Sequence, residues 1–162
     1  DSLLREAFES SKKQNARAPD RPKTQADKGT APVLRRQLED IDFTCPLRGP
    51  IGAAFKPDKD HYGIDIIGPE HSPIKAVLPG SVIQSDWSME NGHTIAIQHA
   101  DNLVSVYKHN SALLRKLGAQ VKAGEAIAII GNTGTLTQGP HLHFELWYQG
   151  RCINPQEYIR FN

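Results

Sequence analysis

Apolar and polar residues alternate along residues 141–148. One set of alternate positions is Leu142, Phe144, Leu146 and Tyr148, and the other is His141, His143, Glu145 and Trp147. A period of two is typical of a β-strand, on which side chains two residues apart point to the same face. The backbones of His141 and His143 are therefore expected roughly 6–7 Å apart, with both imidazoles projecting into one space.

Shorter segments of similar character recur from Phe43 to the end of the chain, at a spacing of about ten residues. We expect strands or extended segments at 51–55, 61–68, 74–77, 81–87, 94–99, 103–109, 125–130 and 141–148. Turn signals separate several of them, at Pro79-Gly80, Asn91-Gly92 and Asp101-Asn102. The pattern predicts a mostly β fold, an antiparallel β-sheet or a barrel-like arrangement.

Two short helices are expected within this β fold. Residues 111–117 have a helical character, with Ser111 as the N-cap and Gly118 as the residue that ends the helix. Residues 154–158, Asn-Pro-Gln-Glu-Tyr, predict a terminal helical turn.

Residues 1–42 form an N-terminal arm or linker, and residues 43–162 form the domain. Apolar residues at helical spacing predict a short amphipathic helix at about residues 2–15. A polar stretch with three prolines follows, which is typical of a linker, and residues 33–41 predict another short helix. Such an arm is either a solvated tether or a segment that packs against the domain and covers its cleft.

Composition narrows the classes of function. The 162 residues carry a formal net charge of +1, which gives no electrostatic signal for nucleic acid binding. The longest strongly apolar run, residues 126–130, is too short to cross a bilayer. No secretory signal is recognisable, but the chain begins at Asp1 without a methionine, as expected of a mature or trimmed chain. The sequence leaves the oligomeric state open.

The two cysteines, Cys45 and Cys152, lie near the two ends of the predicted domain. Neither belongs to a Cys-x-x-Cys pair, so neither resembles part of a zinc ribbon or a redox motif. They are either two unpaired thiols or a disulfide that joins the ends of the domain.

Other residues of the chain can complete a metal site with the histidine pair. Catalytic zinc sites use three protein ligands and leave a fourth position for water. His61 and Asp65 are candidates, although a straight strand would separate their backbones by roughly 13 Å. The chain must therefore bend between them, and Gly63 is placed to allow it. With His143 they would form a set of two histidines and one carboxylate with an open position; otherwise His61 is a surface loop residue and Asp65 caps a turn.

The remaining histidines divide into three groups. His141 shares a face with His143, and His109 ends a strand from which it can reach the same cleft. We interpret His99 as a structural hydrogen-bonding residue. His71 and His93 lie in turn-like segments and are expected at the surface.

Several motifs between residues 45 and 161 occur together in one known family. They are His61-Tyr62-Gly63-Ile64-Asp65, Val106-Tyr107-Lys108-His109, Val121-Lys122-Ala123-Gly124-Glu125 followed by Gly131-Asn132-Thr133-Gly134, Gly139-Pro140-His141-Leu142-His143-Phe144-Glu145, and Asn154-Pro155 with Tyr158. In this combination the sequence resembles lysostaphin- or LytM-type zinc metalloendopeptidases, a family of peptidoglycan hydrolases.

The resemblance implies a β-sheet fold with the site in a groove between loops. It implies that His61, Asp65 and His143 bind Zn²⁺, and that His109 and His141 assist catalysis, in roles that the sequence does not divide between them. It further implies an endopeptidase of the cell envelope, periplasmic or secreted, that cleaves peptidoglycan stem peptides or cross-links by metal-activated water. Which peptide bond is cleaved stays open.

Two loops depart from the family's pattern. Phe55 is followed by Lys56-Pro57 where the family often has Phe-Gly-x-Arg, and the loop at 135–138 is about one residue longer than the commonest form. In the family both loops border the groove, so they bear on the choice of substrate.

Three other classes compete with the enzyme. The first is a LytM-like domain without catalytic activity that activates other wall hydrolases, although all five site positions are present here. The second is a biotinyl- or lipoyl-type carrier, which the absence of a Met-Lys-Met hairpin disfavours. The third is a structural metal site, which the extra histidines disfavour because structural zinc sites are closed by four ligands.

Overall fold

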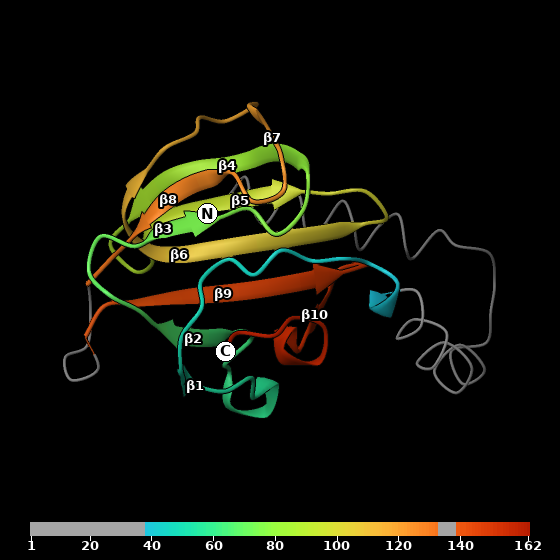
Figure 1. Cartoon of the computed structure of the whole chain (residues 1–162), viewed down its shortest axis with the longest axis horizontal. Helices are drawn as coiled ribbons and strands as arrows, with labels where there is room; N and C mark the ends of the chain where they lie inside the picture. The colour runs from blue at the N-terminus through green and yellow to red at the C-terminus, as the bar shows by residue number, and fades with distance from the viewer. Residues whose placement is uncertain (1–37, 133–138) are drawn as a thin grey trace.

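The computed structural model describes residues 38–132 and 139–162, and these residues form one ten-stranded antiparallel sheet with two short 3₁₀ helices (Figure 1). The strands are β1 (Ile51–Ala53), β2 (Ile64–Ile67), β3 (Pro73–Lys75), β4 (Gly80–Ser88), β5 (Gly92–Gln98), β6 (Leu103–Leu113), β7 (Gln120–Val121), β8 (Ala126–Ile130), β9 (His141–Tyr148) and β10 (Arg151–Ile153). The helices are η1 (Pro57–Lys59) and η2 (Pro155–Glu157).

The long strands β6 and β9 run side by side through the centre of the sheet (Figure 1). The main path of hydrogen-bonded strands is β1-β2-β9-β6-β5-β4-β7, while β10 extends from β9, and β3 pairs with β8. Strand β6 changes partner along its length, because residues 103–108 pair with β9 and residues 110–113 pair with β8. The prediction of an antiparallel sheet is confirmed. The sheet is not closed, so the barrel-like alternative does not apply.

The main hydrophobic core lies on one face of this sheet. Strand β9 contributes Leu142, Phe144 and Leu146, which are fully buried, as the period of two in the sequence predicts. Strands β3 and β8 lie over β4 and β5 in Figure 1, and Ile74 and Ile127 of this second layer join the same core cluster. Burying these apolar side chains supplies the main favourable free energy of folding.

The opposite face of the sheet carries the polar members of β9. His143 pairs across the sheet with Asp65 of β2 on one side and with Lys108 of β6 on the other. Glu145 pairs with Val106 of β6. We call this surface the polar face. It brings together the candidate ligands from β2, from β9 and from the loop before β2.

The predicted turns are confirmed, but one predicted helix is wrong. Asp101 and Asn102 both have positive φ, as a tight two-residue hairpin requires, and Gly92 ends the turn between β4 and β5. The helix expected at 111–117 is absent, since β6 continues to Leu113 and its backbone pairs with β8. A helix of seven residues is marginal on its own, and the hydrogen bonds to β8 replace it. The helical turn near the C-terminus is present as η2.

Most of the expected N-terminal arm lies outside the described residues, together with the question of whether it covers the cleft. The part that is described contributes to the core, since Leu38 is buried and Ile41 packs against the core cluster. Within residues 38–132 and 139–162, we find no helix with the length and hydropathy needed to span a bilayer. The loop at 135–138 is also outside the described residues.

Candidate metal centre

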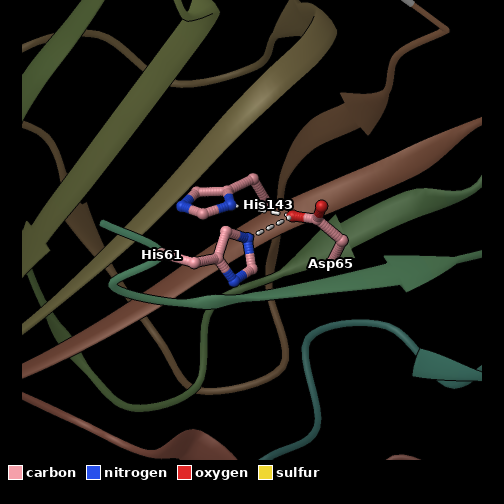
Figure 2. Close-up of side chains that lie close together, drawn as sticks. All are labelled: His61, Asp65 and His143. Atoms are coloured by element: carbon pink, nitrogen blue, oxygen red, sulfur yellow. Dashed lines mark hydrogen bonds and ion pairs between the residues drawn. The ribbon is translucent and has the colours of Figure 1, made fainter. Parts of the chain in front are cut away.

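His61, Asp65 and His143 converge on one point at the polar face (Figure 2). Each offers one ligand atom, and these three atoms lie within 4.8 Å of one another. His143 Nδ1 is 2.8 Å from Asp65 Oδ1, and His61 Nε2 is 3.5 Å from the same oxygen. It is the only such group of histidine, cysteine and acidic side chains in the described part of the chain.

The chain bends before β2 so that His61 and Asp65 can meet, as expected. His61 pairs with Lys56 in an isolated β-bridge, and β2 begins only at Ile64. Besides allowing the bend, Gly63 lets the chain pack closely against β9. A Cβ at this position would overlap the carbonyl oxygen of Phe144, so only glycine lets the segment pack closely against β9.

The outer nitrogen of each imidazole is held by a second group. His61 Nδ1 donates a hydrogen bond to the carbonyl oxygen of Ala54 at 2.6 Å, which directs the lone pair of Nε2 toward Asp65. His143 Nε2 donates to Glu145 Oε2 at 2.8 Å, and this leaves Nδ1 on the side of Asp65. Metal-binding histidines usually have such a partner on their second nitrogen, which fixes the tautomer and the ring orientation.

Glu145 is a buried carboxylate with three donors. Oε2 accepts from His143 and lies 3.2 Å from Lys108 Nζ, while Oε1 accepts from Trp147 Nε1 at 2.9 Å. Burial opposes its ionisation, but these bonds outweigh burial and lower the pKa of Glu145 to about 2. Glu145 is therefore ionised at neutral pH and acts as an acceptor for His143.

The electrostatics of the three ligands favour a cation. Burial lowers the pKa of His143, but the hydrogen bonds to Asp65 and Glu145 raise it by more. Burial likewise raises the pKa of Asp65, and the bond from His143 lowers it overall. The two carboxylates thus keep a positive charge at this position, and a divalent cation can take the place of the Nδ1 proton. Two histidines, one carboxylate and fixed tautomers fit a zinc-type site.

His109 and His141 lie beside the three ligands. The ring centroids of His109 and His141 are 5.5 Å apart, and the ring of His109 is 6.0 Å from that of His143. Burial, followed by repulsion from His143 and His141, lowers the pKa of His109 to about 4. Its imidazole is therefore neutral at neutral pH. His141 Nδ1 donates to the carbonyl oxygen of Gly139 at 3.3 Å, which leaves Nε2 with a lone pair.

Of the other three histidines, His99 and His71 lie where the sequence predicts, and His93 does not. His99 is buried and bonded through both nitrogens, to the Pro79 carbonyl and to Ser105 Oγ, so it is a structural residue. His71 is exposed. His93 differs from the expectation, because it belongs to β5 and is half-buried.

Glu145 and Lys108 are two further residues of the site that were not predicted from the sequence. A signal for Glu145 was available, since it lies two residues after His143 on a strand and must share its face. Lys108 is opposite His143 on β6, a pairing that the sequence alone does not reveal. Cys45 and Cys152 are both partly buried and free in the structure, which shows no disulfide between them.

The sequence is similar to known proteins, and one of them is named as a metalloprotease. The sequence is 38% identical over 125 residues to an uncharacterized metalloprotease of Buchnera aphidicola subsp. Baizongia pistaciae (strain Bp), covering 77% of this chain and 32% of the relative. It is 34% identical over 119 residues to the murein hydrolase activator EnvC of Escherichia coli (strain K12), covering 70% and 28%. It is 38% identical over 98 residues to the peptidoglycan DD-endopeptidase ShyC of Vibrio cholerae, covering 60% and 22%. The chain thus spans less than a third of each of these relatives.

Solved structures share the fold. The crystal structure of a putative peptidase M23 from Pseudomonas aeruginosa superposes with a TM-score of 0.66 at 25% identity, covering 90% of this chain and 64% of the other. A zinc containing peptidase from Vibrio cholerae gives 0.63 at 31% identity, covering 70% and 39%. Lysostaphin from Staphylococcus simulans gives 0.55 at 28% identity, covering 68% and 47%.

The match to a known family covers most of the described residues and includes all five candidate site residues. Residues 59–155 match peptidase family M23, which is more than half of the chain. The resemblance to lysostaphin is confirmed at the level of the family. The chain belongs to peptidase family M23.

Proposed function

We propose that this domain is a zinc-dependent endopeptidase that cleaves peptide bonds in the stem peptides or cross-links of peptidoglycan. The observation that carries the proposal is the arrangement of five side chains on the polar face. His61, Asp65 and His143 converge on one point, and His109 and His141 lie beside it with lone pairs to offer. A purely structural metal site would not need the last two.

Each residue has a role in this proposal. His61 Nε2, Asp65 Oδ1 and His143 Nδ1 would hold the zinc ion. Zinc in such a site lowers the pKa of a bound water to about 7 and polarises a substrate carbonyl. His109, whose pKa lies at about 4, is the neutral ring that accepts a proton from the attacking water. His141 binds the developing oxyanion or protonates the leaving amine.

The direct test is incubation of purified peptidoglycan sacculi with the zinc-loaded protein, followed by mass spectrometry of the released fragments. We expect fragments with new peptide termini, which also identify the bond. A parallel sample with a metal chelator should release none. If the zinc-loaded protein releases no cleaved peptide, and zinc is verified in the sample, the endopeptidase proposal is refuted.

A second candidate function is regulation of another wall hydrolase. The observation that favours it is the similarity to EnvC, which is named as a murein hydrolase activator. Such a domain would release nothing from sacculi alone, yet it would increase the release produced by an added murein hydrolase. The effect would persist after chelation of zinc. Both functions place the domain in the cell envelope, periplasmic or secreted, with peptidoglycan or a wall enzyme as its partner.

A further inference from the structure

His109 reaches the polar face because β6 contains a β-bulge. Strand alternation alone would put His109 on the same face as Tyr107, which is fully buried in the core. Between the pairs Ile95–Tyr107 and His93–Asn110, β5 has one residue and β6 has two, Lys108 and His109. Both of these side chains face the site, since Lys108 contacts Glu145 and His109 lies beside His141. The extra residue therefore turns His109 from the core to the metal centre.

The bulge carries backbone strain. His109 has a φ of 65°, in the left-handed region that residues with a side chain rarely adopt. A conformation of this kind is unfavourable and persists only where the surroundings hold it. The geometry of His109 therefore depends on the contacts around residues 108–110.

Asn110 makes the side-chain contact that spans the bulge. Its Nδ2 donates to the carbonyl oxygen of Tyr107, before the bulge, at 3.0 Å. The same Nδ2 donates to the carbonyl oxygen of His93, on the opposite strand β5, at 3.0 Å. Asn110 is 1% exposed, so water does not compete for these bonds. One amide group thus joins both ends of the bulge to the neighbouring strand.

Two backbone contacts complete the surroundings of His109. Its N–H donates to the carbonyl oxygen of Asn91 at 2.9 Å. On the other side, Gly131 approaches so closely that a Cβ there would overlap the carbonyl oxygen of His109. Neither contact involves the carbonyl oxygens of Tyr107 and His93, which the Asn110 side chain joins.

We infer that Asn110 is a positioning residue that holds the bulge of β6 and thereby orients the His109 imidazole for proton transfer. The inference rests on the proposed function for its catalytic part. Asn110 does not bond to His61, Asp65 or His143 in the structure, so its loss should leave zinc binding intact. It acts on the reaction only through His109.

The test compares Asn110→Ala and Asn110→Ser with the wild type, all as zinc-loaded protein. We expect kcat for peptide release to fall up to about 100-fold with little change in KM, because a misplacement of about 1 Å can cost that much. Zinc affinity, measured by calorimetry, should stay the same. NMR should show altered imidazole signals of His109, a changed HN–Hα coupling at His109, and faster hydrogen exchange of its amide. The serine variant keeps a hydroxyl donor and should retain the fold if the alanine variant loses it.

Gln98→Ala is a matched control at the other end of β6. Gln98 Nε2 also donates to two backbone carbonyls, those of His99 and Leu103, and it holds the hairpin between β5 and β6. We expect this variant to lose stability but to keep both kcat and the His109 signals. If it lowers kcat as much as Asn110→Ala does, the effect is general destabilisation and the inference is overturned.

A double-mutant cycle with His109→Ala isolates the route of the effect. If Asn110 acts through His109, adding Asn110→Ala to His109→Ala should lower kcat no further. A further additive loss of kcat overturns the inference. Unchanged His109 signals in both Asn110→Ala and Asn110→Ser overturn it as well. If the zinc-loaded wild type cleaves nothing, the endopeptidase proposal fails, and the NMR signals of His109 alone decide whether Asn110 holds the bulge.

Discussion

Two histidine-centred networks lie on opposite faces of the same sheet. On the polar face, His143 lies between Asp65 and Glu145. On the core face, His99 lies between the carbonyl oxygen of Pro79 and Ser105 Oγ. Strand β6 contributes to both, with Lys108 to the first and Ser105 to the second. The side chains are of similar kinds, yet the networks differ in the arrangement of their polar atoms. Both nitrogens of His99 have a hydrogen-bond partner in the fold, whereas the His143 network gathers possible metal-ligand atoms at one point.

The His99 network is complete without a ligand. A carbonyl oxygen can only accept, so His99 Nδ1 donates to Pro79 at 2.8 Å, and Nε2 accepts from the Ser105 hydroxyl at 2.7 Å. Ser105 Oγ then accepts from the Tyr107 hydroxyl at 2.8 Å, and Tyr107 accepts from the backbone N–H of Val77 at 3.1 Å. Each donor meets one acceptor, and the chain of bonds requires neutral His99.

The candidate metal centre instead directs the ligand atoms of three side chains toward one point. The outer nitrogens of His61 and His143 are bonded to Ala54 and Glu145, so the inner nitrogens face Asp65. Two carboxylates and two basic rings lie there with capacity for a cation. The two networks thus differ in the convergence of ligand atoms from several side chains on one point, which only the candidate metal centre shows, and not in the kind of residue at their centre.

The largest effect should follow from removal of a ligand of the metal centre. His143→Ala should reduce bound zinc from about one ion per chain to nearly none after dialysis, since a three-ligand site loses an essential donor. Peptide release from sacculi should disappear with it. Metal analysis by mass spectrometry checks the first outcome. His71→Asn, at an exposed position with positive φ that asparagine tolerates, is the control and should keep its zinc.

Removal of His109 should greatly reduce cleavage but should leave metal binding intact. Proton transfer by a positioned side chain contributes about 10²–10⁴-fold to a rate, so His109→Ala should lower kcat by that order while zinc content stays near one ion per chain. The two measurements together separate the ligands from the residues beside them. Substantial cleavage by zinc-loaded His109→Ala would remove His109 from the mechanism.

A smaller effect is expected at the outer partner of the ligand. Glu145→Gln keeps the size of the side chain but replaces the carboxylate that holds His143 Nε2. Loss of such a partner typically lowers metal affinity by about 10- to 100-fold, which competition with a fluorescent chelator can measure. Glu125→Gln is the matched control, since Glu125 also bonds a basic side chain, Arg115, but lies at the surface. An unchanged zinc affinity in Glu145→Gln would mean that Glu145 serves only the fold.

The sequence alone predicts the parts of the site that follow strand alternation. The period of two along β9 puts His141 and His143 on one face, and the structure agrees. The bend between His61 and Asp65 could also be predicted. A straight strand would hold their backbones too far apart to share a metal ion, so a shared site requires the chain to bend. These inferences depend only on local geometry, which is the same in any β-sheet.

The sequence does not predict features that depend on pairing between distant segments. The helix expected at 111–117 is replaced by β6 because β8, distant in sequence, supplies the hydrogen bonds. The bulge at His109 is likewise set by the register of β5 against β6 and by the contacts of Asn110. Strand alternation without the bulge would have put His109 in the core. The expectation of a catalytic role for His109 therefore comes from the family resemblance and not from periodicity.

The smallest predicted effect concerns the completed network on the core face. Burial, only partly opposed by the bond to Pro79, lowers the pKa of His99 below its usual value. Protonation would turn Nε2 into a donor facing the Ser105 hydroxyl, whose own proton would then lose its acceptor. As the pH falls below about 6.5, the unfolded chain takes up this proton before the folded protein does. His99 therefore stabilises the fold above that pH, and this contribution is lost at lower pH.

The pH dependence of His99 is separated from that of the other groups by comparison with His99→Gln, which does not titrate. Urea unfolding should show the wild type more stable than the variant at pH 7.5, and the difference should shrink toward pH 5. Each unit by which the pKa is lowered corresponds to about 1.4 kcal/mol over the full titration. A difference that stays constant between these pH values would mean that His99 does not titrate there. The His99 network would then contribute the same stability at each pH in this range, as an apolar contact does. The two faces of the sheet would differ even more in their response to pH.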